Sequence, residues 1–272
     1  MKTFLDKFSR LLEEKNTILC VGLDPALPKQ RDENVIPSNY IEGHDENETR
    51  LNFCLDIIDK VADYAIAVKL NEQYMFGISR NQHQKIADYL KRKDLLSIYD
   101  CKLGDIAESA ESKIFWINKT GYDAITSFVQ PGNLEQVIHF AHSCSPTIGI
   151  IAITLMSNPE ARKYFLESKF GSSPLCYEIA NDVRKCDADG CVVGSTKHIL
   201  AETIKKIRSI IGNEKIILFP GIGAQKGDIE KTIRFGGSNI IINVGRKIIY
   251  SNNPREGAKE YSIKFNEISS TL

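Results

Sequence analysis

A base lies between two acids at one point in this sequence, where an apolar segment gives way to a polar, helix-like one. The segment reads SIYDCKLGDIAES, and its charged side chains include Asp100, Lys102 and Asp105. Side chains two positions apart on a β-strand point to the same side, so Asp100 and Lys102 are expected to face each other. A carboxylate held against an ammonium group suits proton transfer or the stabilisation of an anion. Solvated turn residues, with Asp105 as a helix cap, are the alternative explanation.

Another lysine lies at the end of the preceding apolar segment, AIAVKLN, in which Lys69 and Asn71 are the polar residues. If the two segments are neighbouring strands of a parallel sheet, Lys69 lies beside Asp100. Opposite charges that are packed together offset the cost of removing each of them from water. The spacing therefore favours a site of alternating charges over a surface turn.

Two segments near the C-terminus have the composition of a phosphate-binding site. They read PGIGAQKGD (220–228) and NVGR (243–246). Glycines let a backbone approach an anion closely, while Gln225 offers an amide and Arg246 a bidentate guanidinium. Barrels often bind phosphate at the loops after the seventh and eighth strands, which are the positions expected here. Tight turns with a surface arginine are the alternative explanation.

The elements that must position these residues follow a regular alternation. Eight short apolar segments alternate with longer amphipathic ones, which predicts a (β/α)8 TIM barrel with its active site at the carboxyl ends of the strands. An open doubly wound sheet is disfavoured, because no GxGxxG sequence follows the first predicted strand. The predicted strands span residues 17–23, 65–71, 95–102, 122–128, 147–154, 189–195, 215–221 and 239–245.

The prediction takes residues 1–272 as a single barrel domain with an extra N-terminal helix. Phe4, Phe8 and Leu11 belong to a helically spaced apolar set that predicts this helix. Two connections are unusually long for a barrel. Residues 24–47 are polar and rich in turn formers, and residues 155–173 form a candidate lid after the fifth strand.

Bulk composition argues against several classes of protein. Lys plus Arg and Asp plus Glu number 35 each, so a formal net charge of zero disfavours binding to nucleic acid or to an anionic membrane. The charged N-terminus is not typical of a signal peptide, and the longest apolar stretch is too short to span a bilayer. Seven scattered cysteines favour a reduced, cytoplasmic protein. The histidines form no metal-binding pattern.

Taken together, these motifs resemble the orotidine 5′-phosphate decarboxylase family, and most closely its longer branch with a TSNP-like motif after the fifth strand. The resemblance implies a homodimeric enzyme of pyrimidine biosynthesis that converts orotidine 5′-monophosphate into uridine 5′-monophosphate and CO₂ without a metal or other cofactor. The motifs occur in the family's order and are VGLDP (21–25), VKLN (68–71), DCKLGDI (100–106), SNP (157–159), PGIGAQKGD (220–228) and VGR (244–246).

The resemblance also implies a role for each matching residue. Asp105 and Ser109 would reach from one subunit into the active site of the other subunit of the dimer. Asp24 would bind the ribose, Ser157 the pyrimidine, and Gln225, Gly245 and Arg246 the phosphate. The implied catalytic residues are Lys69, Asp100, Lys102 and Asp105, and the implied substrate-binding residues are Asp24, Asn71, Ser109, Ser157, Gln225, Gly245 and Arg246.

The sequence departs from the family's pattern in places and leaves rival functions open. Met156 stands where threonine is usual, Lys226 displaces a glycine, and the loop 24–47 has no counterpart. One rival is a sugar-phosphate enzyme of the same superfamily that holds Mg²⁺ with the acids. Others are a Schiff-base aldolase using Lys69 or Lys102, and a barrel that binds a phosphate ligand without catalysis.

Overall fold

A closed ring of eight parallel strands forms the centre of the computed structural model, which describes residues 3–223 and 227–271. Around the ring the strands are ordered β1-β10-β9-β8-β5-β4-β3-β2. This closure confirms the predicted TIM barrel and excludes the open doubly wound sheet. The strands of the ring are β1 (Leu19–Leu23), β2 (Ala67–Asn71), β3 (Leu96–Leu103), β4 (Ala124–Ser127), β5 (Gly149–Leu155), β8 (Gly190–Val193), β9 (Ile216–Ile222) and β10 (Ile240–Val244).

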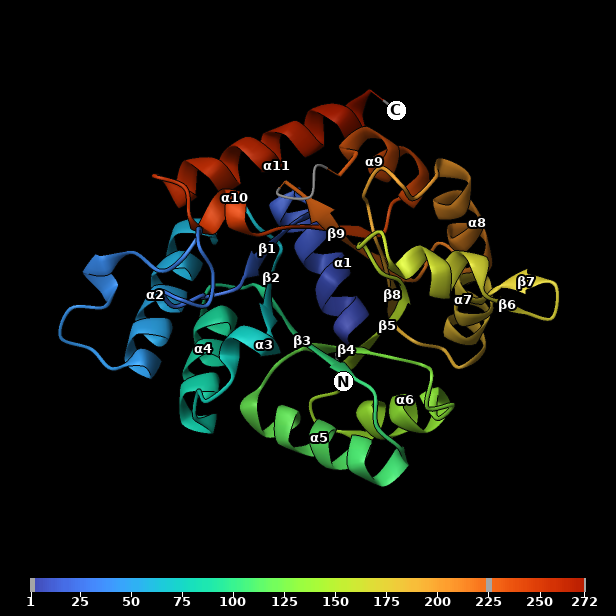
Figure 1. Cartoon of the computed structure of the whole chain (residues 1–272), viewed down its shortest axis with the longest axis horizontal. Helices are drawn as coiled ribbons and strands as arrows, with labels where there is room; N and C mark the ends of the chain where they lie inside the picture. Colours follow the sequence, from blue (N-terminus) through green and yellow to red (C-terminus); the bar gives the residue numbers. More distant parts are fainter. Residues whose placement is uncertain (1–2, 224–226, 272) are drawn as a thin grey trace.

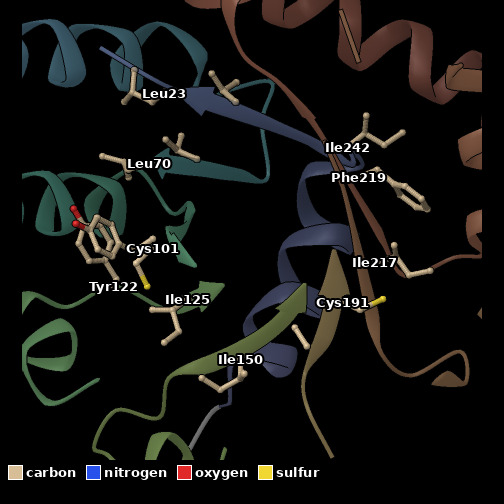
Figure 2. Close-up of a cluster of buried hydrophobic side chains, with 14 of the residues drawn as sticks. Leu23, Leu70, Cys101, Tyr122, Ile125, Ile150, Cys191, Ile217, Phe219 and Ile242 are labelled. Carbon is tan, nitrogen blue, oxygen red and sulfur yellow. The ribbon is translucent and has the colours of Figure 1, made fainter. Parts of the chain in front are cut away.

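Helices surround the ring (Figure 1). The main apolar core lies between them and the strands, and Figure 2 shows strand residues of this layer such as Leu70, Ile125 and Ile217. Burial on both faces explains why the strands are apolar almost throughout. The helices are α2 (Glu46–Val61), α3 (Glu72–Met75), α4 (Arg80–Arg92), α5 (Ala107–Thr120), α6 (Leu134–Ser143), α7 (Leu175–Lys185), α8 (Ala201–Ile211), α9 (Ile229–Gly236), α10 (Arg246–Ile249) and α11 (Pro254–Ser270).

The predicted N-terminal helix is α1 (Phe4–Lys15), and it lies at the centre of the ring in Figure 1. Its buried face packs against the inward-facing side chains of the strands in a second apolar cluster. Lys7 fixes the helix to the amino ends of two strands, because its Nζ lies 2.8 Å from the carboxylate of Asp123 and 2.9 Å from the carbonyl of Leu95. Helix α1 therefore closes the end of the barrel at which the strands begin, opposite their carboxyl ends.

The two long connections have little regular structure. The loop 24–47 contains an isolated bridge between Pro28 and Arg31 and a 3₁₀ turn, η1 (Ser38–Tyr40). After β5 the chain forms a π-helical turn, η2 (Lys163–Glu167), and a small hairpin that the sequence analysis missed. Its strands are β6 (Lys169–Phe170) and β7 (Ser173–Pro174). Within the described ranges, no helix has the length and apolar character needed to cross a membrane.

Candidate active site

A cavity of about 360 Å³ opens at the carboxyl ends of the strands. Its floor contains Ile153, Val192 and Leu218, which also belong to the apolar cluster that packs over α1. The N-terminal helix therefore supports the cavity from below. The sequence-predicted residues that line it are Asp24, Lys69, Asn71, Asp100, Lys102, Ser157, Gly245 and Arg246.

The structure brings Lys69, Asp100 and Lys102 into direct contact. Lys69 Nζ lies 2.7 Å from Asp100 Oδ2, and Lys102 Nζ lies 2.9 Å from Asp100 Oδ1. The side chains of Lys69 and Asp100 are 8% and 12% exposed, whereas that of Lys102 is 32% exposed. Asp100 is thus buried between two ammonium groups, and Lys102 is the one more accessible to a ligand.

The backbone around Lys102 is irregular. Lys102 has φ of +48°, in the left-handed region that residues other than glycine seldom adopt. The pairing of β3 with β4 also shifts register between Tyr99 and Leu103. Such outliers persist where the surroundings hold them, and they are frequent at active sites. Regular strand alternation correctly predicted that Asp100 and Lys102 meet, but a bulge rather than a regular strand presents the lysine.

Burial and charge act in opposite directions on this cluster. Burial raises the pKa of the Asp100 carboxyl, but the two lysines outweigh burial and hold this pKa well below its usual range. Burial likewise lowers the pKa of Lys69, but the charges of Asp100 and then Asp24 raise it above its usual value.

These pKa shifts set the pH range over which the ion pair stabilises the fold. The lowered pKa of Asp100 means that its contribution is present above about pH 3.9 and is lost as the pH falls through the folded-state value. The raised pKa of Lys69 means that its contribution is present below about pH 10.4 and is lost as the pH rises through the folded-state value. The alternating charges therefore persist throughout the neutral range.

Two polar residues of the site were missed by sequence reasoning. Thr126 donates from Oγ1 to Asp100 Oδ1 at 2.8 Å and accepts the backbone N–H of Lys102 at 3.0 Å. Asn243 lines the cavity from β10. Asn243 is the polar residue of an otherwise apolar strand, which is a signal that could have identified it, whereas Thr126 is followed by a second polar residue, Ser127, in a four-residue strand. Thr126 connects the carboxylate to the bulged backbone and so fixes both.

The predicted phosphate-binding segments lie on the opposite wall of the cavity, after β9 and β10. Gly221 and Gly223 have φ of +106° and +90°, conformations that bend the chain tightly where other residues would be strained. Gly245 and Arg246 line the cavity beside them. Gln225 lies outside the described residues, as does Lys226, so the prediction for Gln225 stays a prediction.

The connection after β5 supplies a further part of the wall. Met156, Ser157 and Asn158 all line the cavity. The backbone carbonyl of Ser157 accepts a hydrogen bond of 2.8 Å from Thr196 Oγ1, which ties this segment to the loop after β8. The methionine that departs from the family's pattern is therefore part of the site.

Asp105 and Ser109 are not part of this cavity. Both are exposed, and they line a neighbouring groove that also contains Lys102, Lys113 and Trp116. Asp105 is not the helix cap that the sequence allowed. The N-cap of α5 is Ile106, whose backbone N–H donates to the Asp105 carboxylate at 2.8 Å.

The donor set of the cluster does not suit a metal ion. Across residues 3–223 and 227–271, no group of three or more His, Cys, Asp and Glu side chains could hold a metal ion. Asp100 is engaged through both oxygens by Lys69, Lys102 and Thr126. A cation would have to displace two ammonium groups to reach this carboxylate, so the cluster suits an anionic or electron-rich ligand better.

Comparison with known proteins agrees with this geometry. Orotidine 5′-phosphate decarboxylases from Janthinobacterium sp. (strain Marseille) and Christiangramia forsetii are each 30% identical, over 263 and 279 residues. These alignments cover 92% of this chain and 90% of the first protein, and 95% of this chain and 95% of the second. The crystal structure of Plasmodium berghei orotidine 5′-monophosphate decarboxylase has the same fold, with a TM-score of 0.82 and 23% identity over 98% of this chain and 99% of that one.

A family-level match covers most of the chain. The sequence model described as "Orotidine 5'-phosphate decarboxylase / HUMPS family" matches residues 17–261, a span that runs from the start of the barrel into α11. It includes every residue that lines the cavity. The resemblance drawn from the six motifs is thereby confirmed, and the chain belongs to the orotidine 5′-phosphate decarboxylase / HUMPS family.

Proposed function

We propose that this protein converts orotidine 5′-monophosphate into uridine 5′-monophosphate and CO₂. The observation that carries the proposal is the buried Lys69–Asp100–Lys102 cluster at the mouth of the barrel, with its accessible lysine facing the cavity. The relatives named above carry this activity in their names. The cavity also provides separate regions for a charged reaction centre and a remote anion.

Lys102 has the chemistry that the reaction needs. The bond between C6 of the pyrimidine and the carboxylate breaks, CO₂ leaves, and the electron pair remains on C6. No carbonyl is adjacent to delocalise this pair, so a nearby ammonium group lowers the energy of the transition state. Lys102 then gives one Nζ proton to C6, which completes uridine 5′-monophosphate, and regains a proton from water. Asp100 keeps the lysine charged and oriented until that transfer.

The rest of the cavity is suited to holding the nucleotide. Arg246, Gly245 and Gln225 are assigned to the phosphate, Asp24 and Asn71 to the sugar side, and Ser157 to the pyrimidine. Binding the phosphate far from the reacting bond contributes to the rate, because it orders the substrate and closes the site. The connection that carries Met156 and the β6–β7 hairpin is the candidate for the closing segment.

The exposed position of Asp105 and Ser109 supports a homodimer with shared active sites. Both side chains are exposed outside the cavity, where they can contact a second copy of the chain. Exposed Ile106, Phe115 and Trp116 lie in the same region of the chain, and apolar exposure of this kind favours an interface. In the dimer, the partner subunit's Asp105 would complete the Lys–Asp–Lys–Asp set, and the partner subunit's Ser109 would contact the substrate.

We also place this activity in the cytoplasm. The seven cysteines are all free thiols in the structure, and five of them are buried. A chain with scattered, unpaired cysteines suits a reducing compartment.

The direct test of function is the ultraviolet absorbance of orotidine 5′-monophosphate incubated with the purified protein and a chelator. We expect the absorbance to change as the substrate is consumed. One uridine 5′-monophosphate should appear for each orotidine 5′-monophosphate lost. Tight binding of the nucleotide without turnover would instead identify a non-catalytic barrel. Turnover of a sugar phosphate that stops with the chelator would identify the magnesium-dependent rival.

Shared active sites predict complementation between two inactive variants. Lys102→Ala and Asp105→Ala homodimers are each expected to have very low activity. In a mixed dimer, one site combines the intact Lys102 of one chain with the intact Asp105 of the other, so it is fully wild type. Random exchange should therefore restore about a quarter of wild-type activity, because about half of the dimers are mixed and each has one good site. Mixtures no more active than their components would show that the sites are not shared.

A further inference from the structure

The backbone around Asp24 is held in place by Tyr250, a residue distant in sequence that lies just after α10 at the same end of the barrel. Tyr250 donates from its hydroxyl to the Asp24 carbonyl at 2.8 Å and accepts the N–H of Ala26 at 2.9 Å. The ring of Tyr250 stacks on Phe53 of α2, with ring centroids 5.6 Å apart. The start of the loop 24–47 is thus rigidly placed, and the orientation of the Asp24 side chain depends on other contacts.

Arg31 provides the cationic contact of that side chain. Its Nη2 lies 3.7 Å from Asp24 Oδ2, and its Nε donates to Tyr74 Oη at 2.9 Å. The guanidinium also lies over the ring of Tyr74, 4.2 Å from the centroid. Tyr74 belongs to α3, directly after β2, so Arg31 connects the first long loop to the next strand end. A cation that both stacks and donates in this way is well fixed.

The pair retains unused hydrogen-bonding capacity. Asp24 Oδ1 and Arg31 Nη1 are both buried, and neither has a hydrogen-bond partner among the residues described. The two side chains are 23% and 18% exposed. Asp24 lines the cavity, so a ligand hydroxyl can donate to its free oxygen. A buried acceptor without a partner is costly unless a ligand supplies the missing donor.

Lys69 is a second cation of the cavity on which the charge of Asp24 acts. Burial lowers the pKa of Lys69, and the charges of Asp100 and then Asp24 raise it, so Asp24 and Lys69 attract each other across the cavity. In the structure Lys69 is paired with Asp100, and Asp24 is paired with Arg31. Removal of the arginine would leave Asp24 free to turn toward Lys69 and disturb the catalytic cluster.

We propose that Arg31 is a positioning residue that holds the Asp24 carboxylate on the sugar-binding side of the cavity and away from Lys69. The inference rests on the proposed function, because it assigns Asp24 to a hydroxyl of the nucleotide's sugar. It gives the loop 24–47, which has no counterpart in the family's motifs, a part in substrate binding. Tyr74 supports this role by fixing the guanidinium through a hydrogen bond and stacking.

The test is a double-mutant cycle measured as kcat/KM for orotidine 5′-monophosphate. We expect Arg31→Met to lower kcat/KM about tenfold in the otherwise wild-type enzyme. In an Asp24→Ala background the same change should lower it by less than about twofold, because there is no carboxylate left to position. Removal of a sugar hydroxyl from the substrate should likewise cost less in Arg31→Met than in wild type. Arg255→Met, which breaks an exposed ion pair with Asp63, is the matched control and should leave kcat/KM unchanged.

The outcomes separate this inference from the proposed function. If the wild-type protein does not decarboxylate the nucleotide at all, the proposed function fails. If the wild-type protein does decarboxylate the nucleotide, but Arg31→Met lowers kcat/KM by the same factor in both backgrounds or does not lower it at all, the positioning role is wrong. Should Arg31→Met not fold, Arg31→Gln removes the charge while keeping a hydrogen-bond donor for Tyr74, and the same cycle applies. Arg31→Lys, which keeps the charge, should recover part of the loss.

Discussion

Replacing Lys102 with alanine is expected to lower kcat for decarboxylation by about 10⁴-fold or more. Proton transfer by a positioned group contributes about 10²–10⁴-fold, and a fixed charge beside a developing anion contributes about 10²–10³-fold. Lys102 is proposed to do both, so both contributions are lost. The measurement is the rate of absorbance change at saturating orotidine 5′-monophosphate.

The variant should still bind nucleotide, because the residues assigned to phosphate and sugar are unchanged. Titration with uridine 5′-monophosphate is expected to give an affinity within a few-fold of wild type, as the removed side chain faces the reacting bond and not the phosphate. Lys259→Ala removes an exposed lysine paired with Glu256 on α11 and serves as the control, with activity unchanged. Near-normal turnover in Lys102→Ala would contradict the assignment of the proton donor.

Replacing Asp100 with asparagine is expected to affect both activity and stability. The change leaves the Lys69 and Lys102 ammonium groups facing each other without their shared carboxylate. Breaking a buried ion pair by removal of one partner typically costs about 3–5 kcal/mol of unfolding free energy. We expect a loss of this size in denaturant unfolding, and a fall in kcat of about 10³-fold because Lys102 is no longer held in place.

The pH dependence of that loss has a definite sign. In wild type the pKa of Lys69 is raised, so the contribution of this residue to stability is present and constant between about pH 6 and about pH 9. In Asp100→Asn, burial lowers the pKa of Lys69 with its main carboxylate partner gone, so the unfolded state binds more protons than the folded state. Stability relative to wild type should therefore rise with pH over that range.

An exposed acid provides the matched control for this experiment. Asp63→Asn breaks the surface pair with Arg255 and should change the unfolding free energy by about 1 kcal/mol or less. A similarly small change in Asp100→Asn would mean that the buried cluster is not held by its ion pairs. A difference from wild type that does not vary with pH would mean that Lys69 remains fully charged without Asp100.

The fold and most of the cavity were predictable because their signals are local. Eight apolar segments of strand length, each followed by an amphipathic segment, are typical of one architecture, and all eight strands lie within two residues of their predicted bounds. The rule that barrel sites lie at the carboxyl ends of strands then places Asp24, Lys69, Asp100 and Arg246 around one opening. No contact between distant residues had to be known for that step.

Other features depended on how distant segments meet. The left-handed conformation of Lys102 accompanies a register shift against β4, and Thr126 is the residue of β4 that accepts its backbone N–H. The pairing of Arg31 with Asp24 requires the loop 24–47 to fold back on α3, which no periodicity signals. The position of Asp105 outside the cavity likewise follows from where α5 begins.

The sequence alone therefore determined which residue types stand at the strand ends, and with them the barrel, the lysine–aspartate cluster and the segments assigned to phosphate. Periodicity and strand order carry this information, because it depends on neighbours along the chain. Only the tertiary structure decided that a bulge presents Lys102, that Thr126 completes the hydrogen bonds of the cluster and that Arg31 pairs with Asp24. These features depend on how separate segments of the chain meet, which closure of the ring, strand register and the path of the loop 24–47 determine.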